Sequence, residues 1–328
     1  MLVAFTVSQI FPAVALAEPE VYGKLLLSVE HIDDETDAND YWDVKSHDSR
    51  FGIKGDFATD TDSLKVIYQL EWAVDITDEA NSSNDHIKAR NQYVGLQGTF
   101  GEIIAGRNDT PLKSSQGKFD LFNDYLDMKV LMAGAENRES NIIQYTAPKL
   151  ADAVTVRLMI RPGEESDGEN NGLADGISAS AAYDADSIYA ALAYDSNIDG
   201  EDVSTIRAVL TWKLGDLRVG GLLQSTDWNT PDNEDVLVAN ASYSVGKTKL
   251  KLQLGHTENY GGIATNVAGD DNTADYLVLG ADFRLGEKTT LGTYVGMQEG
   301  GDNLAVDPLL AGGPYTRDTI GVILIHSF

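Results

Sequence analysis

Apolar and polar residues alternate along most of this chain with a period of two. The clearest stretches are residues 21–30, 64–74, 206–213, 250–254 and 277–283. In the third of these, every second residue is apolar, namely Ile206, Ala208, Leu210 and Trp212. Such alternation predicts strands with one apolar face and one polar face. Because no long amphipathic helix is indicated outside one central connection, the chain is predicted to be all-β.

The connections between these strands are alternately short and long. Short turns are indicated near residues 58–62, 99–102, 148–152, 184–187, 215–216, 246–248 and 286–288. Longer loops rich in Asp, Asn and Gly fall at residues 33–45, 75–86, 163–175, 196–202, 229–234, 257–273 and 299–315. A transmembrane β-barrel has short periplasmic turns and long extracellular loops. The pattern therefore predicts a transmembrane antiparallel barrel of about sixteen strands, an even number typical of such barrels.

Aromatic residues fit the two interfaces of such a barrel. Those near the long loops are Trp72 and Trp228, and those near the short turns are Phe57, Trp212, Tyr243 and Phe283. We expect these residues to form two interfacial girdles.

A soluble secreted β-sandwich or sugar-binding barrel is the alternative architecture. It would need a closed apolar interior, yet Lys, Glu, Gln, Arg and Ser recur on one face of nearly every predicted strand. A barrel of about eight strands is filled by side chains, whereas about sixteen leave an aqueous lumen. The alternation therefore favours polar side chains inside and apolar side chains against lipid.

The connection from Asn108 to Arg138 is too long for an ordinary turn. A structureless connection of such length is usually functional or disordered. This one is rich in apolar residues, namely Phe119, Leu121, Phe122, Tyr125, Leu126, Met128, Val130, Leu131 and Met132. Disordered segments lack such anchors. We therefore expect the connection to pack inside the barrel.

The N-terminal residues 1–17 contain no charge, are mainly apolar and end Ala15-Leu16-Ala17. An apolar core followed by small residues at a cleavage site predicts a secretory signal peptide. The expected organisation is thus a signal peptide over 1–17 and a barrel over 18–328. Beyond the N-terminus no apolar run is long enough for a transmembrane helix.

Charge and composition exclude several functions. The chain of 328 residues has 52 acidic and 24 basic residues, a net charge of −28 and no cysteine. Nucleic acid is excluded as a partner because phosphate binding needs a basic surface. The five histidines show no ligand spacing, so no metal or other cofactor is expected. Residues 241–248 match a relaxed phosphate-loop pattern, but a strand follows them where that motif needs a helix.

Several motifs resemble those of the Gram-negative general porins of the sixteen-stranded, trimeric type. They are Val21-Tyr22-Gly23-Lys24-Leu25, Ser49–Gly55, Leu64–Glu71, Arg90–Leu96, Gly106–Lys113 and Ile325-His326-Ser327-Phe328. The resemblance spans residues 21–328 and implies a third loop folded into the barrel. One departure is the last strand, 319–328, which carries more apolar residues on its nominal lumen face than expected and leaves its register open.

The resemblance also implies a constriction at which acidic groups of the third loop face basic groups of the wall. Carried over position by position, the wall residues are Lys24, Arg50, Arg90 and Arg138, and the loop residues are Asp120, Asp124, Asp127 and Glu136. Alternation independently places Lys24 and Arg50 on polar faces. Opposed charges across a narrow pore favour small polar solutes over apolar ones. The simpler interpretation is that these residues are charges solvated by the lumen.

The expected function is an outer-membrane porin rather than an enzyme. It would be a water-filled channel for passive diffusion of ions and small hydrophilic solutes, with a weak to moderate preference for cations. The expected partners are two further copies in a homotrimer, outer-membrane lipids and lipopolysaccharide. A substrate-selective channel would need an aromatic track, and Tyr22, Tyr125 and Tyr294 are too scattered to predict one. An outer-membrane barrel enzyme would need clustered Asp/His or Ser/His residues, whereas the histidines are dispersed.

Overall fold

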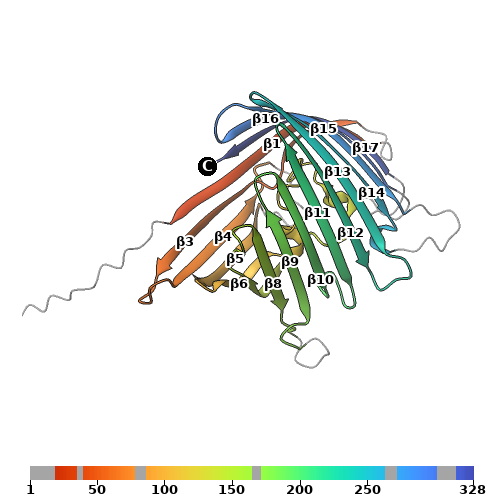
Figure 1. Cartoon of the computed structure of the whole chain (residues 1–328). Helices are drawn as coiled ribbons and strands as arrows, with labels where there is room; N and C mark the ends of the chain where they lie inside the picture. The colour runs from red at the N-terminus through yellow and green to blue at the C-terminus, as the bar shows by residue number, and fades with distance from the viewer. Residues whose placement is uncertain (1–18, 35–39, 78–85, 165–170, 263–271, 301–314) are drawn as a thin grey trace, which may run out of the picture.

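The strands follow one another around the wall of a barrel, each antiparallel to its neighbours (Figure 1). The computed structural model describes residues 19–34, 40–77, 86–164, 171–262, 272–300 and 315–328. The first nine strands are β1 (Glu20–Asp34), β2 (Tyr41–Ser46), β3 (Arg50–Ala58), β4 (Lys65–Val74), β5 (Ile87–Gly98), β6 (Gly101–Asp109), β7 (Arg138–Thr146), β8 (Val154–Arg161) and β9 (Gly176–Asp184). The others are β10 (Ile188–Ser196), β11 (Ser204–Leu214), β12 (Leu217–Asp227), β13 (Glu234–Val245), β14 (Thr248–Glu258), β15 (Ala274–Arg284), β16 (Thr289–Gly300) and β17 (Tyr315–Ser327). The described ranges also contain three short helical turns: α1 (Pro111–Ser114), η1 (Met128–Leu131) and η2 (Tyr260–Gly262).

The first and last strands close the barrel. β1 pairs with β17 in antiparallel register, from Lys24 opposite Ser327 to Asp34 opposite Arg317. β2 and β3 both pair with β1, over successive stretches of it. They are therefore two halves of one strand interrupted at residues 47–49. The seventeen strands of the sheet thus form a closed barrel of sixteen, which confirms the predicted architecture.

The two faces of the wall have opposite character. On β11, Ile206, Leu210 and Trp212 are 50–57% exposed on the outside, whereas Arg207 and Thr211 are at most 5% exposed on the inside. Strands β1, β14 and β15 follow the same rule. The inward side chains are shielded from solvent because the connection between β6 and β7, described below, fills part of the lumen. No helix within the described ranges is long and apolar enough to cross a membrane.

The aromatic residues follow the girdle prediction with one exception. Phe57, Trp212, Tyr243 and Phe283 are 37–50% exposed at the turn ends. At the loop end, Trp72 stacks on Phe51 with ring centroids 5.5 Å apart. The side chain of Trp228 instead lies against the backbone of two glycines, Gly134 between β6 and β7 and Gly262 in η2. A Cβ added at either glycine would collide with it. The expectation for Trp228 was wrong because the strand phase at the end of β12 turns this side chain inward.

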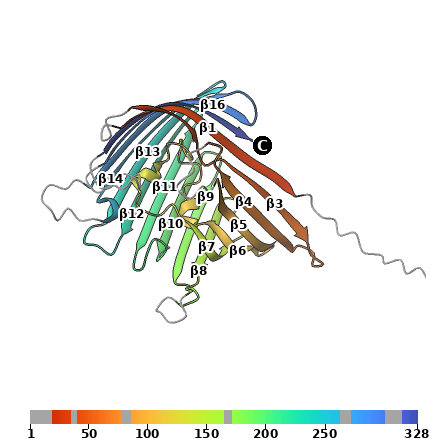
Figure 2. The ribbon, with the colours of Figure 1, turned by 180° about the vertical axis from the view of Figure 1, so that it is seen from behind.

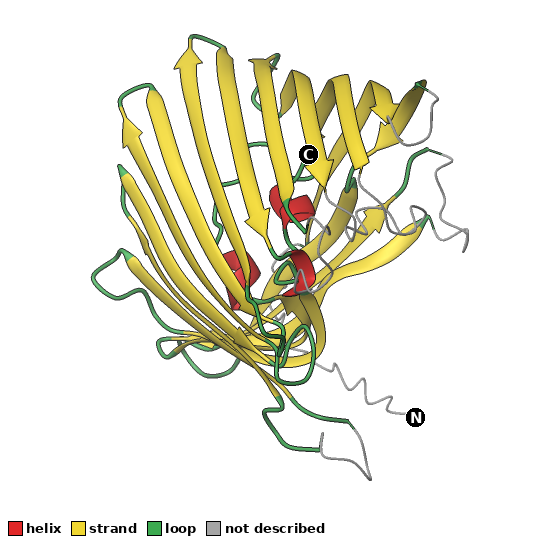
Figure 3. Ribbon diagram, turned by 90° about the vertical axis from the view of Figure 1, so that its right-hand side faces the viewer, coloured by secondary structure: helices red, strands yellow, loops and turns green. Residues whose placement is uncertain are grey.

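The connection between β6 and β7, residues 110–137, lies inside the ring of strands (Figures 2 and 3). We call it the inner loop. Its apolar residues form the main core of the molecule with inward-facing residues of the wall, among them Leu26, Val209, Leu222, Val238 and Ile323. The apolar residues of the closing strand are thereby explained. Ile323 and Ile325 face inward in β17 and pack under the inner loop rather than facing water.

Candidate functional site

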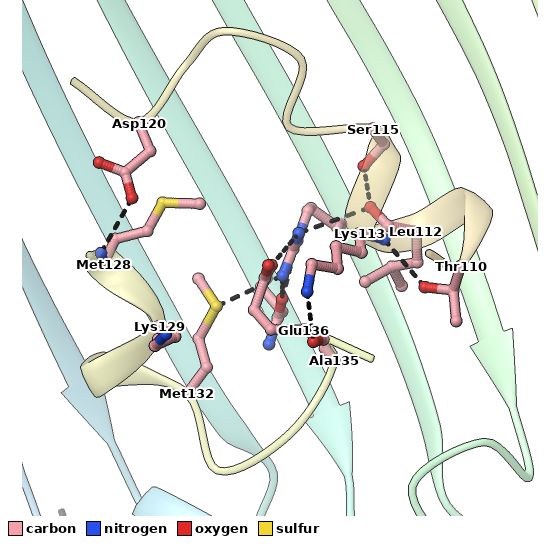
Figure 4. A network of polar contacts seen from close by, with 12 residues as sticks. Thr110, Leu112, Lys113, Ser115, Asp120, Met128, Lys129, Met132, Ala135 and Glu136 are labelled. Atoms are coloured by element: carbon pink, nitrogen blue, oxygen red, sulfur yellow. Dashed lines mark hydrogen bonds and ion pairs between the residues drawn. The ribbon is translucent and has the colours of Figure 1, made fainter. Parts of the chain in front are cut away.

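The inner loop begins with a capped helical turn. Thr110 precedes Pro111, which is favoured at the first helical position because it needs no backbone donor there. The Thr110 hydroxyl oxygen accepts a hydrogen bond of 3.0 Å from the Lys113 backbone N–H (Figure 4). Tyr189 on β10 donates to the Ser115 carbonyl at 2.7 Å. These contacts hold the start of the loop against the wall.

Asp120 is the internal brace of the inner loop. Its carboxylate accepts a hydrogen bond of 2.9 Å from the Phe122 backbone N–H and one of 3.0 Å from the Met128 backbone N–H, the second of which is drawn in Figure 4. The Gln253 side chain on β14 donates to the same group at 2.8 Å. Desolvation, with Asp127 nearby, raises the pKa of this carboxyl group. Asp120 thus shapes the loop, and its oxygens are turned to the loop's own backbone.

Asp124 joins the inner loop to the opposite wall. One carboxylate oxygen lies 2.7 Å from the Lys24 ammonium on β1 and 3.1 Å from the Arg50 guanidinium on β3. Burial opposes ionisation of Asp124, but Arg50 and Lys24 outweigh it and lower the pKa of this carboxyl group. Both basic side chains keep 19–26% of their surface exposed. The structure therefore brings together three of the predicted residues, and water still reaches them.

Arg90 and Arg138 pair with the wall rather than with the inner loop. Arg90 lies 2.8 Å from Glu71 and 3.3 Å from Asp48. Arg138 lies 2.9 Å from Asp109. The two arginines stand on β5 and β7, on either side of β6. Their charges are thus matched by neighbouring carboxylates on the wall.

The last two predicted loop residues have different surroundings. Asp127 begins η1, and its carboxylate accepts a hydrogen bond of 2.9 Å from the Lys129 backbone N–H. Glu136 lies 2.7 Å from the guanidinium of Arg207 on β11. Burial raises the pKa of Glu136, although Arg207 opposes this shift. Glu136 is therefore an anchor of the loop on the wall, whereas Asp127 stands at the loop's partly exposed edge.

Two basic residues that the sequence did not single out hold the inner loop. Arg207 is fully buried and contacts the Gln224 side chain at 2.6 Å in addition to Glu136. Lys251 on β14 lies 2.8 Å from Asp282 and donates to the Leu121 carbonyl at 3.1 Å. Both occupy inward positions of strands in which polar and apolar residues alternate. That phase was readable from the sequence, but the contacts of these two residues with the inner loop were not.

Carboxylates from two other loop-end positions hold the second half of the inner loop. Asp199 accepts hydrogen bonds from the Ala135 backbone N–H at 3.1 Å and from the Asn137 side chain at 2.7 Å. Glu234 at the start of β13 accepts from the Ala133 backbone N–H at 3.2 Å. Backbone donors that have no strand partner are satisfied in this way. The loop is therefore fixed along its whole length.

The three tyrosines considered for a solute track do not form one. Tyr125 of the inner loop and Tyr294 of β16 have ring centroids 5.2 Å apart, in the core between the loop and the wall. Tyr294 donates to Glu30 at 2.6 Å. Tyr22 on β1 donates to Glu71 on β4 at 3.0 Å. Their hydroxyl groups serve the wall and the loop docking.

Known proteins resemble this chain over nearly its whole length. The family model of Gram-negative porins matches residues 2–303. The major outer membrane protein P.IB of Neisseria gonorrhoeae is 22% identical over 92% of this chain and 93% of that protein. An anion-selective porin from Comamonas acidovorans has a TM-score of 0.76 at 20% identity, covering 95% of this chain and 99% of that one. OmpT of Vibrio cholerae, solved in a trimer form, has a TM-score of 0.65 at 16% identity, with coverage of 95% and 99%.

The family match, the relatives and the closed barrel point to the same conclusion. Lipid-facing apolar residues surround a polar interior, which is the arrangement of a water-filled channel in a membrane. This chain belongs to the Gram-negative porin family and is a channel of the bacterial outer membrane rather than an enzyme.

Proposed function

We propose that this porin is a general diffusion channel for ions and small hydrophilic solutes, constricted by its inner loop and weakly to moderately selective for cations. The observation that carries the proposal is the contact of Asp124 with Lys24 and Arg50. It places the edge of the loop against β1 and β3, while the loop's apolar residues cover much of the wall from β9 to β17. The solute path would then run beside β3–β7.

The charges beside this path support a weak preference. The four wall residues Lys24, Arg50, Arg90 and Arg138 contact four carboxylates in total, those of Asp48, Glu71, Asp109 and Asp124. The narrow region is therefore close to neutral. The net charge of −28 must act mainly from elsewhere, and residues 78–85 and 301–314, within two of the long loops predicted from the sequence, include acidic but no basic residues. Because the Debye length is about 8 Å at physiological ionic strength, distant loops are strongly screened.

Cation preference is the first expected result. In a KCl gradient across a planar bilayer, the reversal potential should have the sign of potassium permeation at low salt. The preference should weaken as salt increases, because screening removes the contribution of the outer loops. A reversal potential of the opposite sign at low salt would rule out the proposed selectivity, while a conducting channel would still support the diffusion function.

Assembly as a homotrimer is the second expected result. The family resemblance and the trimer form of the Vibrio cholerae relative support this part of the proposal. Unheated electrophoresis should show a species that heating converts to the monomer, and mass measurement in detergent should give three chains. A stable monomer in both measurements would contradict it. Outer-membrane lipids and lipopolysaccharide are proposed to cover the outward apolar side chains.

A further inference from the structure

A cavity of about 380 Å³ lies between the start of the inner loop and the turn ends of β8–β12. Ser114, Gly117 and Lys118 of the inner loop form one side of it. Arg157 on β8 and Arg218 on β12 are among the wall residues on the other side. Both arginines occupy inward positions of their strands. Val156 and Leu158, the neighbours of Arg157 on β8, face away from the lumen, and Arg218 alternates with the outward residues of β12.

The basic side chains of this cavity lack ion-pair partners. Among the residues that the structure describes, no carboxylate lies within ion-pair distance of Lys118, Arg157 or Arg218, whereas Lys24 and Arg50 share Asp124. One carboxylate, Asp184, also lines the cavity. The cavity therefore carries three positive charges against one negative charge. This differs from the balanced charges beside β3–β7.

Hydrogen-bonding groups complete the lining. Thr155 and Thr211 contribute hydroxyl groups from β8 and β11. Tyr189 holds the inner loop in place above the cavity through the Ser115 carbonyl. Guanidinium groups bind oxyanions through two parallel hydrogen bonds, and hydroxyl groups add further donors. The volume lies at the small end of the range for small-molecule sites, about 300–1,000 Å³.

We propose that this cavity is a binding station for small solutes that carry a phosphate or carboxylate group. The station rests on the proposed diffusion function, since the solute reaches it through the channel. The cavity lies at the end of the barrel that carries the short turns, which is the periplasmic side. Arg157 and Arg218 are half-buried and Lys118 is exposed, so solvent can compete for these charges and binding should be weak enough for release, as passage requires. A local site of this kind is compatible with weak cation preference because its field is screened within about 8 Å.

Current recordings with matched variants test the proposal. Inorganic phosphate and succinate, added on the turn side at constant ionic strength, should each reduce the chloride current, and glucose should not. In Arg157→Gln/Arg218→Gln the concentration needed should rise by about tenfold for each guanidinium removed, the factor that corresponds to about 1.4 kcal/mol. The control is Lys247→Gln/Lys288→Gln, which removes two charges from exposed turns outside the cavity.

The outcomes separate this station from the channel function. Equal block of the wild type and the arginine variant would overturn the station, as would an equal loss of block in the control. Normal KCl conductance without any effect of phosphate or succinate would overturn it too, while leaving the diffusion channel intact. No conductance in KCl would instead defeat the proposed function. If the double variant fails to fold, Lys118→Gln on the exposed loop surface provides the same comparison with one charge.

Discussion

Replacing Arg207 with Met should release the inner loop from β11 and raise the single-channel conductance. The guanidinium is fully buried, lies 2.7 Å from Glu136 and contacts Gln224 at 2.6 Å. Its removal leaves the Glu136 carboxylate without its charge partner. Removing one partner of a buried ion pair lowers the stability of the folded state by about 3–5 kcal/mol. A loop that is docked less tightly should also fluctuate, so we expect added current noise and faster proteolysis within residues 110–137.

The double variant Glu136→Leu/Arg207→Met provides the matched control. Replacing both partners of a buried pair with apolar residues of similar size is often neutral or stabilising. Conductance and noise should therefore return toward the wild-type values. Arg284→Gln, at an inward position near the turn side of β15, should change neither. If the single variant retained wild-type conductance, noise and protease resistance, the anchor role of Arg207 would be wrong.

Replacing Asp124 with Asn should move ion selectivity toward anions more than any other single carboxylate change in the inner loop. The substitution keeps the size of the side chain but leaves Lys24 and Arg50 without their shared counter-charge. Both bases then act within a Debye length of the narrow region, about 8 Å at physiological ionic strength. Reversal potentials in a KCl gradient measure the change. Asp216→Asn, on an exposed turn, removes the same charge and should leave the reversal potential nearly unchanged.

Acid should reproduce the effect of this substitution. Arg50 and Lys24 lower the pKa of Asp124, so the ionised form is favoured in the folded protein. A depressed pKa contributes stability above the ordinary value for Asp, about 3.9, which is lost as pH falls through the lower folded value. The contribution of Asp124 to selectivity, measured as the difference between the wild type and Asp124→Asn, should therefore stay constant down to about pH 4 and be lost only below it. An early change shared with Asp124→Asn would point to another titrating group.

The strands of this porin were predictable because their information is local. Successive side chains of a strand point to opposite faces, so the apolar and polar positions of residues such as Ile206 and Arg207 follow from spacing alone. Short and long connections alternate for a similarly simple reason, since they lie on opposite sides of one membrane. A barrel must also close on itself, and its first and last strands do pair, from Lys24 opposite Ser327 onward.

The inner loop was predictable in its existence but not in its contacts. Its length and its apolar residues indicated a segment packed in the lumen. However, it has no regular period, so nothing local distinguished the exposed carboxylates from those that brace the fold. Asp120 binds backbone groups of its own loop, whereas Asp124 reaches Lys24 and Arg50. Only the path of the folded loop separates these roles.

The anchors of the loop depended entirely on the tertiary structure. Arg207 and Glu136 are 71 positions apart in the sequence, and Lys251 lies even farther from the Leu121 carbonyl that it binds. The apolar side chain of Ile323 looked misplaced on a lumen face until the inner loop covered it. Alternation determined which residues of this protein face inward. Which of them meet the loop, and which meet water, was decided by packing between segments that are distant in the sequence, because such contacts leave no periodic signal in either segment.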